Sequence, residues 1–556
     1  MLRVSTGIGL AVFGFLAAEA SLLTALREEL ERNAAALRKQ VQPAYFVAYQ
    51  VTDLQTVTVE AQAGKLRRSL HQRSRWLDVD VRVGSYELDN TRPLQEAFRL
   101  GERTYPVQLP LGEDGGAIRH LVWQATMNAY DRAAEEYAKV VAGRSVRVQE
   151  SDSVPDFSRE QPRRDRRLRP HLQVDTAVWA RRLRELSALF ADHPWIYSHR
   201  VSLQANSVQK FLLNTEGTEL AWSEQAIFLS ISAQTRADDG MELPLYRTYF
   251  AFQFEELPSL ERIQKDIVRM IELLRRLREA AVLETYSGPA ILSGEAAGVF
   301  FHEILGHRVE GHRQKDPGSA QMLRDLLGKQ ILPSFLDVVF DPTQRYRDGI
   351  PLAGSYPYDD EGVPGQRVLV VERGILRGFI LNRTPVPGFS QSNGHGRRQS
   401  GLSSVARQSN LLVLARETVS PGQLRLLLRE ECRRQGKEFG LLFDVVEGGF
   451  TFTARTIPNA FNVMPLVVYK VYADERPDEL VRGIDLIGTP LMTFAHIVAA
   501  GSDVGIFNGI CGAESGSVPV SSSSPSLLVS RIEVQKKAKS DERPPILPPP
   551  SVQPAL

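Results

Sequence analysis

A short run near the middle of this 556-residue chain holds two histidines and a glutamate at a spacing that could bind and use a metal ion. Glu303 directly follows His302, and His307 comes five residues after His302. Neutral imidazoles are good zinc ligands, and a neighbouring carboxylate can act as a general base toward a zinc-bound water. These residue types predict a zinc peptidase in which Glu303 activates that water.

The interval between the histidines differs from the four-residue interval of common zinc peptidase helices. At about 100° per residue, a five-residue step places two side chains about 140° apart on a regular helix. We therefore expect the helix to widen or to end between His302 and His307, and Gly306 would ease that distortion. The alternative is a pair of core histidines on a buried helix.

Several residues could complete such a site. A third ligand could come from Glu310 or His312, just after the motif, or from Cys511 or Glu514, much later in the chain. Glu310 could instead orient one imidazole through its second nitrogen. The second cysteine, Cys432, could form a disulfide with Cys511. A ligand role for Cys511, in a glycine-flanked loop, is the favoured interpretation.

A second polar segment, residues 393–400, reads Asn-Gly-His-Gly-Arg-Arg-Gln-Ser. Its glycines would let the backbone approach a ligand closely. Arg397 or Arg398 could hold a carboxylate terminus or an oxyanion, and His395 could donate a hydrogen bond to one. A glycine-rich surface loop with salt-bridged arginines is an equal alternative, so these residues are candidates for binding substrate or for supporting the metal ligands.

The elements around these residues predict an α+β protein, with N-terminal α+β domain(s) followed by a β-rich C-terminal domain that carries the zinc-binding helix. An arginine cluster beside prolines is interpreted as a solvated linker rather than a phosphate-binding arm. The expected divisions are a signal peptide (1–20), an N-terminal α+β domain (21–150), an Arg/Pro-rich linker (151–175), a middle α+β region (176–285), a C-terminal zinc peptidase domain (286–535) and a disordered Pro-rich tail (536–556).

The first twenty residues have the pattern of an export signal. Arg3 precedes an apolar run that ends at Ala17, and Ala18-Glu19-Ala20 offers a cleavage site. We therefore expect export to the periplasm or the exterior, with a cytoplasmic protein as the alternative. No other stretch approaches the length of a membrane span. The net charge of +1 gives no reason to expect nucleic acid as a partner.

Seven motifs in the C-terminal half, taken in order, resemble those of the TldD/PmbA family, metallopeptidases once described as modulators of DNA gyrase. They are His302-Glu303-x-x-x-His307 with Glu310-Gly311, Asp359-Asp-Glu-Gly362, Asn393-Gly-His-Gly-Arg-Arg-Gln399, Ala406-Arg-Gln-Ser-Asn410, Glu447-Gly-Gly449, Val481-Arg-Gly483 and Cys511-Gly-x-x-x-Gly-Ser-Val-Pro-Val520.

The resemblance implies that His302, His307 and Cys511 bind Zn²⁺ and that Glu303 is the catalytic base. It implies peptide or unfolded protein substrates bound in extended form, and a homodimer or a heterodimer with a sister subunit. Because the whole motif is present, the chain resembles the active, TldD-type subunit. The alternative is a non-catalytic partner subunit in which zinc is structural or absent. His312 departs from the acidic residue that is frequent at this position.

Overall fold

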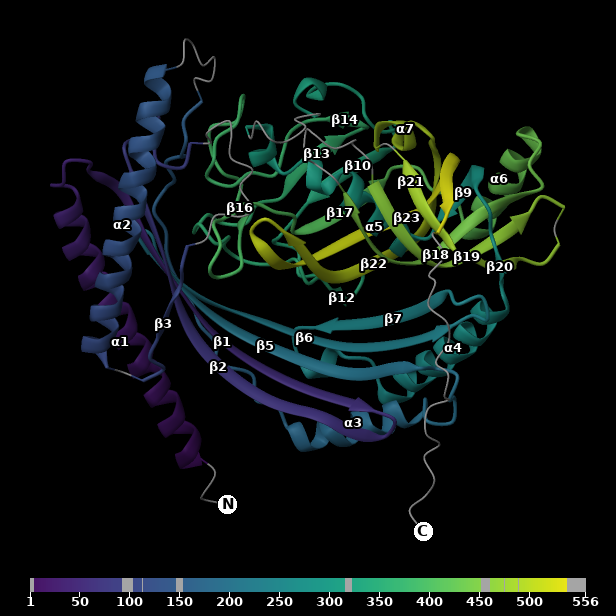
Figure 1. Ribbon diagram of the computed structural model, residues 1–556, viewed down its shortest axis with the longest axis horizontal. Helices are drawn as coiled ribbons and strands as arrows, with labels where there is room; N and C mark the ends of the chain where they lie inside the picture. Colours follow the sequence, from purple (N-terminus) through teal and green to yellow (C-terminus); the bar gives the residue numbers. More distant parts are fainter. Residues whose placement is uncertain are drawn as a thin grey trace.

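The protein has two large β-sheets that lie against each other. The computed structural model describes residues 5–92, 104–112, 114–146, 154–315, 323–451, 461–474, 476–488 and 490–537. A seven-stranded sheet comes from the N-terminal half, and a twelve-stranded sheet from the C-terminal half. The long strands of the first sheet curve beneath the C-terminal domain (Figure 1). The predicted α+β class, with a β-rich C-terminal domain that contains the histidine helix, is confirmed.

The first sheet has the strand order β3-β2-β1-β5-β6-β4, with β7 beside β6. Apart from the short β4, which is parallel to β6, its neighbouring strands are antiparallel. The bounds are β1 Ala44–Gln62, β2 Lys65–Val83, β3 Val107–Leu109, β4 Arg164–Arg167, β5 Ser198–Asn214, β6 Glu219–Arg236 and β7 Glu242–Ala251. The Asn214-Thr-Glu-Gly217 segment turns the chain between β5 and β6, as its turn-forming residues predict.

Strands from both sides of the arginine-rich segment belong to this one sheet. β1 pairs with β5 along most of its length, from Ala48 opposite Asn214 to Ala61 opposite Val201. The segment expected to be a linker contributes the edge strand β4. The expected N-terminal and middle regions therefore share a sheet instead of forming separate units. Alternating burial within a strand shows which face is buried, but it does not show which distant strand lies beside it.

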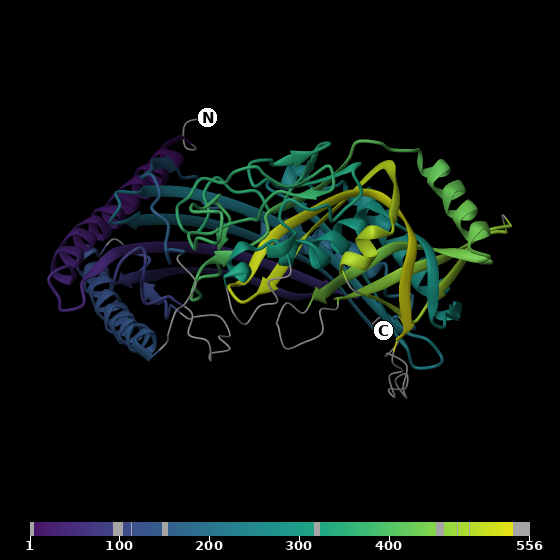
Figure 2. The same cartoon turned by 90° about the horizontal axis from the view of Figure 1, so that it is seen from above.

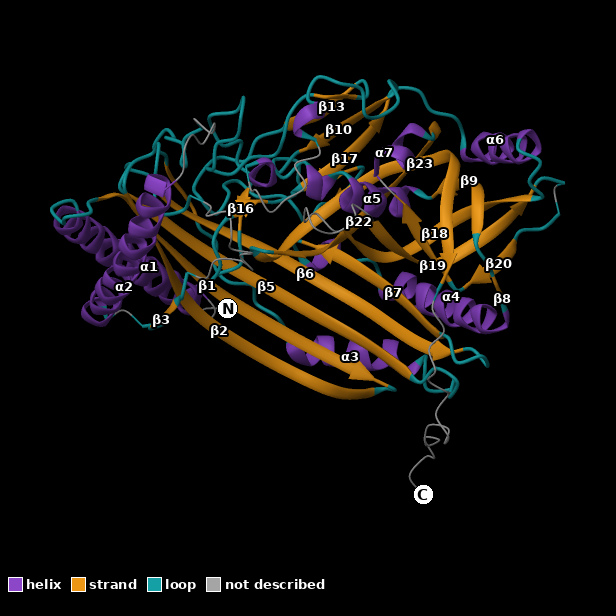
Figure 3. Ribbon diagram, turned by 45° about the horizontal axis from the view of Figure 1, so that its top comes forward, coloured by secondary structure: helices purple, strands orange, loops and turns teal. Residues whose placement is uncertain are grey.

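In the part of the chain that the structure describes, four helices support the first sheet: α1 Ser5–Leu37, α2 Gly115–Val146, α3 Thr176–Ala188 and α4 Leu260–Glu279. α1 and α2 pack together at one end, and α3 and α4 cover the face turned away from the C-terminal domain (Figure 3). α4 begins where the Ser259 hydroxyl accepts the Arg262 amide hydrogen bond, and a stripe of buried apolar residues at helical spacing faces the sheet.

α1 runs without a break from Ser5 to Leu37, so it crosses the predicted cleavage point after Ala20. Within the described residues, no helix combines the length and apolar character needed to cross a membrane. Signal cleavage and export therefore stay predictions. Of the expected Pro-rich tail (536–556), Lys536 is the last residue of a strand, and residues 538–556 lie outside the described residues.

The second sheet has the order β14-β13-β10-β17-β23-β9-β18-β19-β20-β8, with β21 beside β19 and β23, and β22 beside β23. Its bounds are β8 Ala281–Val282, β9 Tyr286–Leu292, β10 Leu336–Phe340, β13 Val368–Glu372, β14 Ile375–Leu376, β17 Asn410–Ala415, β18 Phe439–Thr451, β19 Phe461–Tyr472, β20 Glu479–Arg482, β21 Ile484–Gly488, β22 Ile497–Ala513 and β23 Gly516–Lys536. Two short pairs lie outside it: β11 Tyr346–Arg347 with β12 Ile350–Pro351, and β15 Gly396–Arg397 with β16 Val405–Ala406.

Three helices accompany this sheet: α5 Gly294–Ile304, α6 Pro421–Arg434 and α7 Pro490–Ala495. α5 is buried in the main apolar core of the domain. α6 lies at the end of the molecule away from α1 and α2 (Figure 2).

Charged side chains join the two sheets. The Asp360 carboxylate accepts hydrogen bonds from Lys210 of β5 and from Gln50 of β1. The Arg398 guanidinium donates to the same Gln50 side chain. Because Asp360 and Arg398 are buried or nearly so, these contacts hold the C-terminal domain over the curved sheet.

Candidate metal centre

The helix that carries His302 and Glu303 lies unusually close to the sheet beneath it. Its first turn is capped by the Ser293 hydroxyl, which accepts a hydrogen bond from the Ala296 amide. A Cβ at Gly298 would lie 3.1 Å from the Ser522 carbonyl oxygen, and one at Gly294 would lie 2.2 Å from the backbone of β22. Small residues on this face therefore let α5 pack against the β22–β23 hairpin.

The helix ends between the two histidines, which confirms that prediction. α5 ends at Ile304, and a 3₁₀ turn from Gly306 to Arg308 carries His307. Gly306 does not have the left-handed conformation that would require glycine. Its need for glycine is spatial, because a Cβ there would lie 2.0 Å from Oε1 of the fully buried Gln408.

Gly306→Ala is expected to destabilise the protein by about 1–3 kcal/mol, the usual cost of forcing an extra methyl group into a packed site. Gln408 would have to move, and its hydrogen bond to the His302 carbonyl would be lost. Urea unfolding measures the change. Gly422→Ala is the control, because that glycine lies in α6 with nothing within 4 Å of its added Cβ. Equal stability of the two variants would contradict the expectation.

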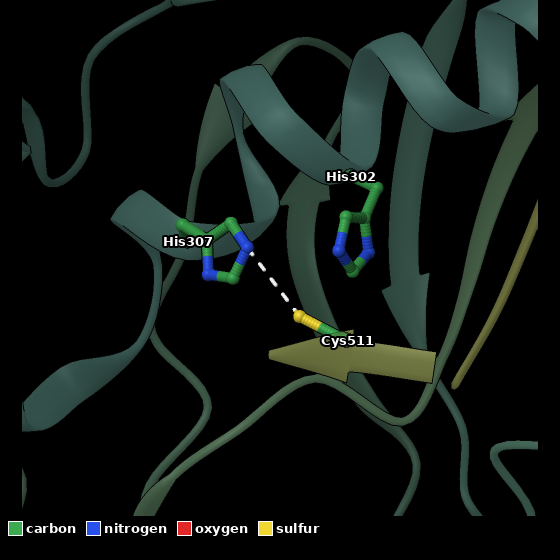
Figure 4. A group of neighbouring side chains, drawn as sticks. All are labelled: His302, His307 and Cys511. Carbon is green, nitrogen blue, oxygen red and sulfur yellow. Dashed lines mark hydrogen bonds between the residues drawn. The ribbon is translucent and has the colours of Figure 1, made fainter. Parts of the chain in front are cut away.

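His302, His307 and Cys511 converge on one point from α5, the 3₁₀ turn and β22 (Figure 4). One ligand atom from each residue lies within 4.8 Å of the other two. The Cys511 Sγ is 3.5 Å from His307 Nε2, and the two imidazole rings are steeply inclined, at 78°. All three side chains are buried.

This donor set fits zinc. Tetrahedral zinc bonds of about 2.1 Å to nitrogen and about 2.3 Å to sulfur separate the two ligand atoms by about 3.6 Å. The Cys511–His307 separation of 3.5 Å matches that value. A set of one thiolate and two imidazoles binds zinc in preference to calcium or magnesium, which prefer oxygen ligands.

The three residues also adjust one another's charge. Burial by itself opposes ionisation of the Cys511 thiol, but His307 and His302 beside it bring its pKa well below the usual range. Burial likewise opposes the charged form of His307, yet Glu310 and Cys511 raise the His307 pKa well above its ordinary value. The site therefore favours the thiolate, which is the form that binds a metal.

A buried carboxylate lies against the outer side of His307. Glu310 is completely buried and lies 3.3 Å from His307 Nδ1. Its oxygen Oε2 also accepts two hydrogen bonds from the Arg313 guanidinium. Burial would raise the Glu310 pKa, but His307, Arg313 and Arg407 lower it to about 2. Glu310 is thus a carboxylate that keeps Nδ1 protonated and directs Nε2 toward Cys511.

His312 and Glu514 are paired with each other. The His312 Nε2 lies 2.6 Å from a Glu514 oxygen, and Arg313 donates to the other Glu514 oxygen at 3.0 Å. Burial opposes the Glu514 charge, but His312 and Arg313 hold the pKa of Glu514 far below its usual range. Within the described residues, neither side chain joins the group that could hold a metal.

The segment 393–398 does not reach the metal cavity. The Arg397 guanidinium donates to the carbonyl oxygens of Gln408 and Pro519. Arg398 donates to Gln50, in the first sheet. His395 is completely buried, and burial lowers its pKa to about 3. These three side chains brace the fold, so the structure does not place them where a substrate at the metal would contact them.

The metal group lines a cavity of about 370 Å³. Glu303 lies in its wall beside the ligands, together with Glu447, Phe507 and Ile510. Those last three residues also line an adjoining cavity of about 860 Å³, between the faces of β5–β7 and the edge of β22. The metal group therefore lies at one end of a larger space between the two sheets.

Four residues at the metal centre have no role predicted from the sequence: Arg313, Arg407, Gln408 and Glu447. Arg407, Gln408 and Glu447 lie inside motifs shared with the family, and these motifs were the signal in the sequence that could have indicated a role. Arg313 lay outside every quoted motif, and only its contacts with Glu310 and Glu514 reveal it.

Comparison with known proteins assigns this domain to a family. Residues 285–536 match the model of the PmbA/TldA metallopeptidase C-terminal domain. The C-terminal domain of the chain belongs to the TldD/PmbA family. A metalloprotease of Archaeoglobus fulgidus is 28% identical over 48% of this chain and 58% of its own length. The zinc metalloprotease TldD homolog of Saccharolobus solfataricus is 26% identical over 62% of this chain and 72% of its own length.

The TldD/PmbA fold extends over nearly the whole chain. A modulator of DNA gyrase from Thermotoga maritima superposes with a TM-score of 0.61, covering 91% of this chain and 99% of its own, at 18% identity. The sequence matches are shorter: the chain spans about half to two thirds of the length of the first curated relatives that it matches. The likeness in fold therefore covers more of the chain than these sequence matches do.

Proposed function

We propose that this TldD/PmbA family member is a zinc-dependent metallopeptidase that hydrolyses peptides or unfolded polypeptide segments. The observation that supports it most is the convergence of His302, His307 and Cys511 in one cavity, with Glu303 in the wall of that cavity. A zinc relative, the TldD homolog of Saccharolobus solfataricus, agrees with this choice of metal.

A set of three ligand residues favours a catalytic zinc over a purely structural one. Structural zinc sites have four protein ligands, whereas catalytic sites keep one position for water or substrate. Glu310 and His312 were the nearby residues that could close the site. Glu310 contacts the far side of His307, and His312 pairs with Glu514. Within the described part of the chain, three candidate ligands remain, and the cavity beside them is large enough for a peptide group.

The roles follow from these positions. When bound, zinc supplies a Lewis acid that polarises a carbonyl group and lowers the pKa of water. Glu303 accepts a proton from the attacking water and passes it to the leaving amine. Its neighbour Arg308 donates a hydrogen bond to the Glu303 carbonyl oxygen, which holds the last turn of α5 in place. Glu310 keeps the His307 ring in the orientation that faces the cavity.

The edge of β22 supports an extended peptide as the substrate. Among the described strands, β22 forms ladder hydrogen bonds with β23 alone. Its residues from Ile506 to Ile510 line the larger cavity. Free backbone groups on a strand edge can pair with an added extended chain, and such pairing selects an unfolded segment with little regard for its sequence. Cys511 directly follows this edge, so a peptide bound there would approach the metal.

Metal removal tests the function. The purified protein is expected to contain about one zinc per chain and to hydrolyse an unfolded substrate such as casein. Treatment with 1,10-phenanthroline should abolish hydrolysis, and zinc should restore it while magnesium should not, because the ligand set is nitrogen and sulfur. Elemental analysis accompanies each assay. Undiminished hydrolysis by zinc-free protein would overturn the proposal.

A further inference from the structure

Arg407 and Gln408 are consecutive residues between β16 and β17, and both are completely buried. Their side chains contact different parts of the metal centre. Arg407 reaches the tip of the β22–β23 hairpin, which carries Cys511. Gln408 reaches the end of α5, which carries His302. One short segment thus touches both of the elements that bring ligands together.

The Arg407 guanidinium ties down the hairpin tip through three donated hydrogen bonds. Nη2 donates to the Cys511 carbonyl oxygen at 2.8 Å. Nη1 donates to the Ser515 hydroxyl at 2.9 Å and to the Gly516 carbonyl oxygen at 2.8 Å. Nε faces the Glu310 carboxylate at 3.6 Å. Arg407 therefore connects the strand of Cys511 to the carboxylate that orients His307.

Gln408 makes the matching contact on the other element. Its Nε2 donates to the His302 carbonyl oxygen at 3.2 Å. The side chain also fills the space against Gly306, the residue just before His307. Neither Arg407 nor Gln408 lines the metal cavity or its larger neighbour. Any effect that they have on the metal must therefore act through the position of the ligands.

We propose that Arg407 and Gln408 are positioning residues that hold Cys511 at the correct distance from His302 and His307 before zinc binds. The proposal rests on the proposed function, because it concerns the same centre. Cys511 needs such support because, among the described strands, β22 has β23 as its one ladder partner, where Cys511 pairs with Val518. The rigid guanidinium fork suits three simultaneous acceptors in a way that a lysine ammonium does not.

The first test is the zinc affinity of Arg407→Gln, measured by competition with a chromophoric chelator. Loss of an outer-shell partner usually weakens metal binding by about 10- to 100-fold, and we expect a loss in that range. Cobalt substitution gives a second readout, because the thiolate-to-cobalt absorption band reports how well Cys511 is placed. We expect that band to weaken in Arg407→Gln and to recover in part in Arg407→Lys.

Arg383→Gln is the matched control. Arg383 is as deeply buried as Arg407, and it bonds to the Ser158 carbonyl oxygen and to Glu216, none of which lines the metal cavity. Both glutamine variants should melt at lower temperatures than the wild type, because each removes a buried guanidinium. Only Arg407→Gln should lose zinc affinity. With zinc saturating, its KM for peptide should stay at the wild-type value.

Gln408→Met is the second variant, and it keeps the side-chain length while removing the amide. Its zinc affinity should also fall. If Arg407→Gln does not fold, the zinc affinity of Gln408→Met still tests the inference. The inference would be overturned if Gln408→Met and one Arg407 variant (Arg407→Gln or Arg407→Lys) both kept the wild-type zinc affinity and the wild-type cobalt spectrum. A wild-type protein that binds no zinc would instead overturn the proposed function.

Discussion

Glu303→Gln is expected to lower kcat for peptide hydrolysis by about 10²- to 10⁴-fold, the usual contribution of a general base, while the zinc content stays at the wild-type level. Glutamine has nearly the shape of glutamate but cannot take a proton from water. The side chain is buried in the cavity wall beside His302. Steady-state kinetics and elemental analysis on the same samples measure both quantities.

Glu29→Gln is the control for replacing a buried glutamate. Glu29 lies in α1, where it bonds to Arg32 and Arg119, far along the chain from the metal group. This variant should lose some stability but keep its kcat. Full activity in Glu303→Gln would remove Glu303 from the mechanism. A large loss of zinc in the same variant would show that it supports the ligands instead.

Cys511→Ser is expected to weaken zinc binding by more than about 100-fold, beyond the range that outer-shell partners produce, and to abolish hydrolysis at ambient zinc. A serine hydroxyl stays protonated near neutral pH and is a poor ligand compared with a thiolate. Because serine and cysteine have similar sizes, the hairpin should still fold. Zinc competition, with activity measured on the same protein, tests this expectation.

Cys432→Ser separates metal binding from a general effect of removing a thiol. Both cysteines are free in the structure, and Cys432 is completely buried in a small apolar cluster around α6. Burial raises the Cys432 pKa to about 11, so that thiol stays neutral. Its replacement should lower stability and leave zinc affinity unchanged. Equal zinc affinity in Cys511→Ser and the wild type would exclude Cys511 as a ligand.

The local geometry of the histidine motif was predictable because it depends on neighbouring residues alone. A five-residue step cannot bring two side chains to one face of a regular helix, so the helix had to change between His302 and His307. The reason for Gly306 was not predictable in the same way. Gln408, which excludes a side chain there, is about a hundred residues away in the chain.

Cys511 shows what the family resemblance contributed. Its flanking glycines suggested a loop, but the residue lies in β22, paired with Val518. No local pattern could place it beside His307, 204 positions earlier. Arg397 and Arg398 show the opposite limit. Arginine side chains suit the binding of a carboxylate ligand, yet these two donate hydrogen bonds to protein acceptors in the structure. The residue type alone does not distinguish binding a ligand from bracing the fold.

The central place of β23 in the second sheet has a consequence for how this protein is made. β23 follows every other described strand in the sequence, yet it lies between β17 and β9 and pairs with the strand that carries Cys511. On the ribosome, the halves of this sheet therefore cannot close until residues 516–536 have emerged. The metal centre is completed only then, so an unfinished chain would not yet have the site to which we assign peptide hydrolysis.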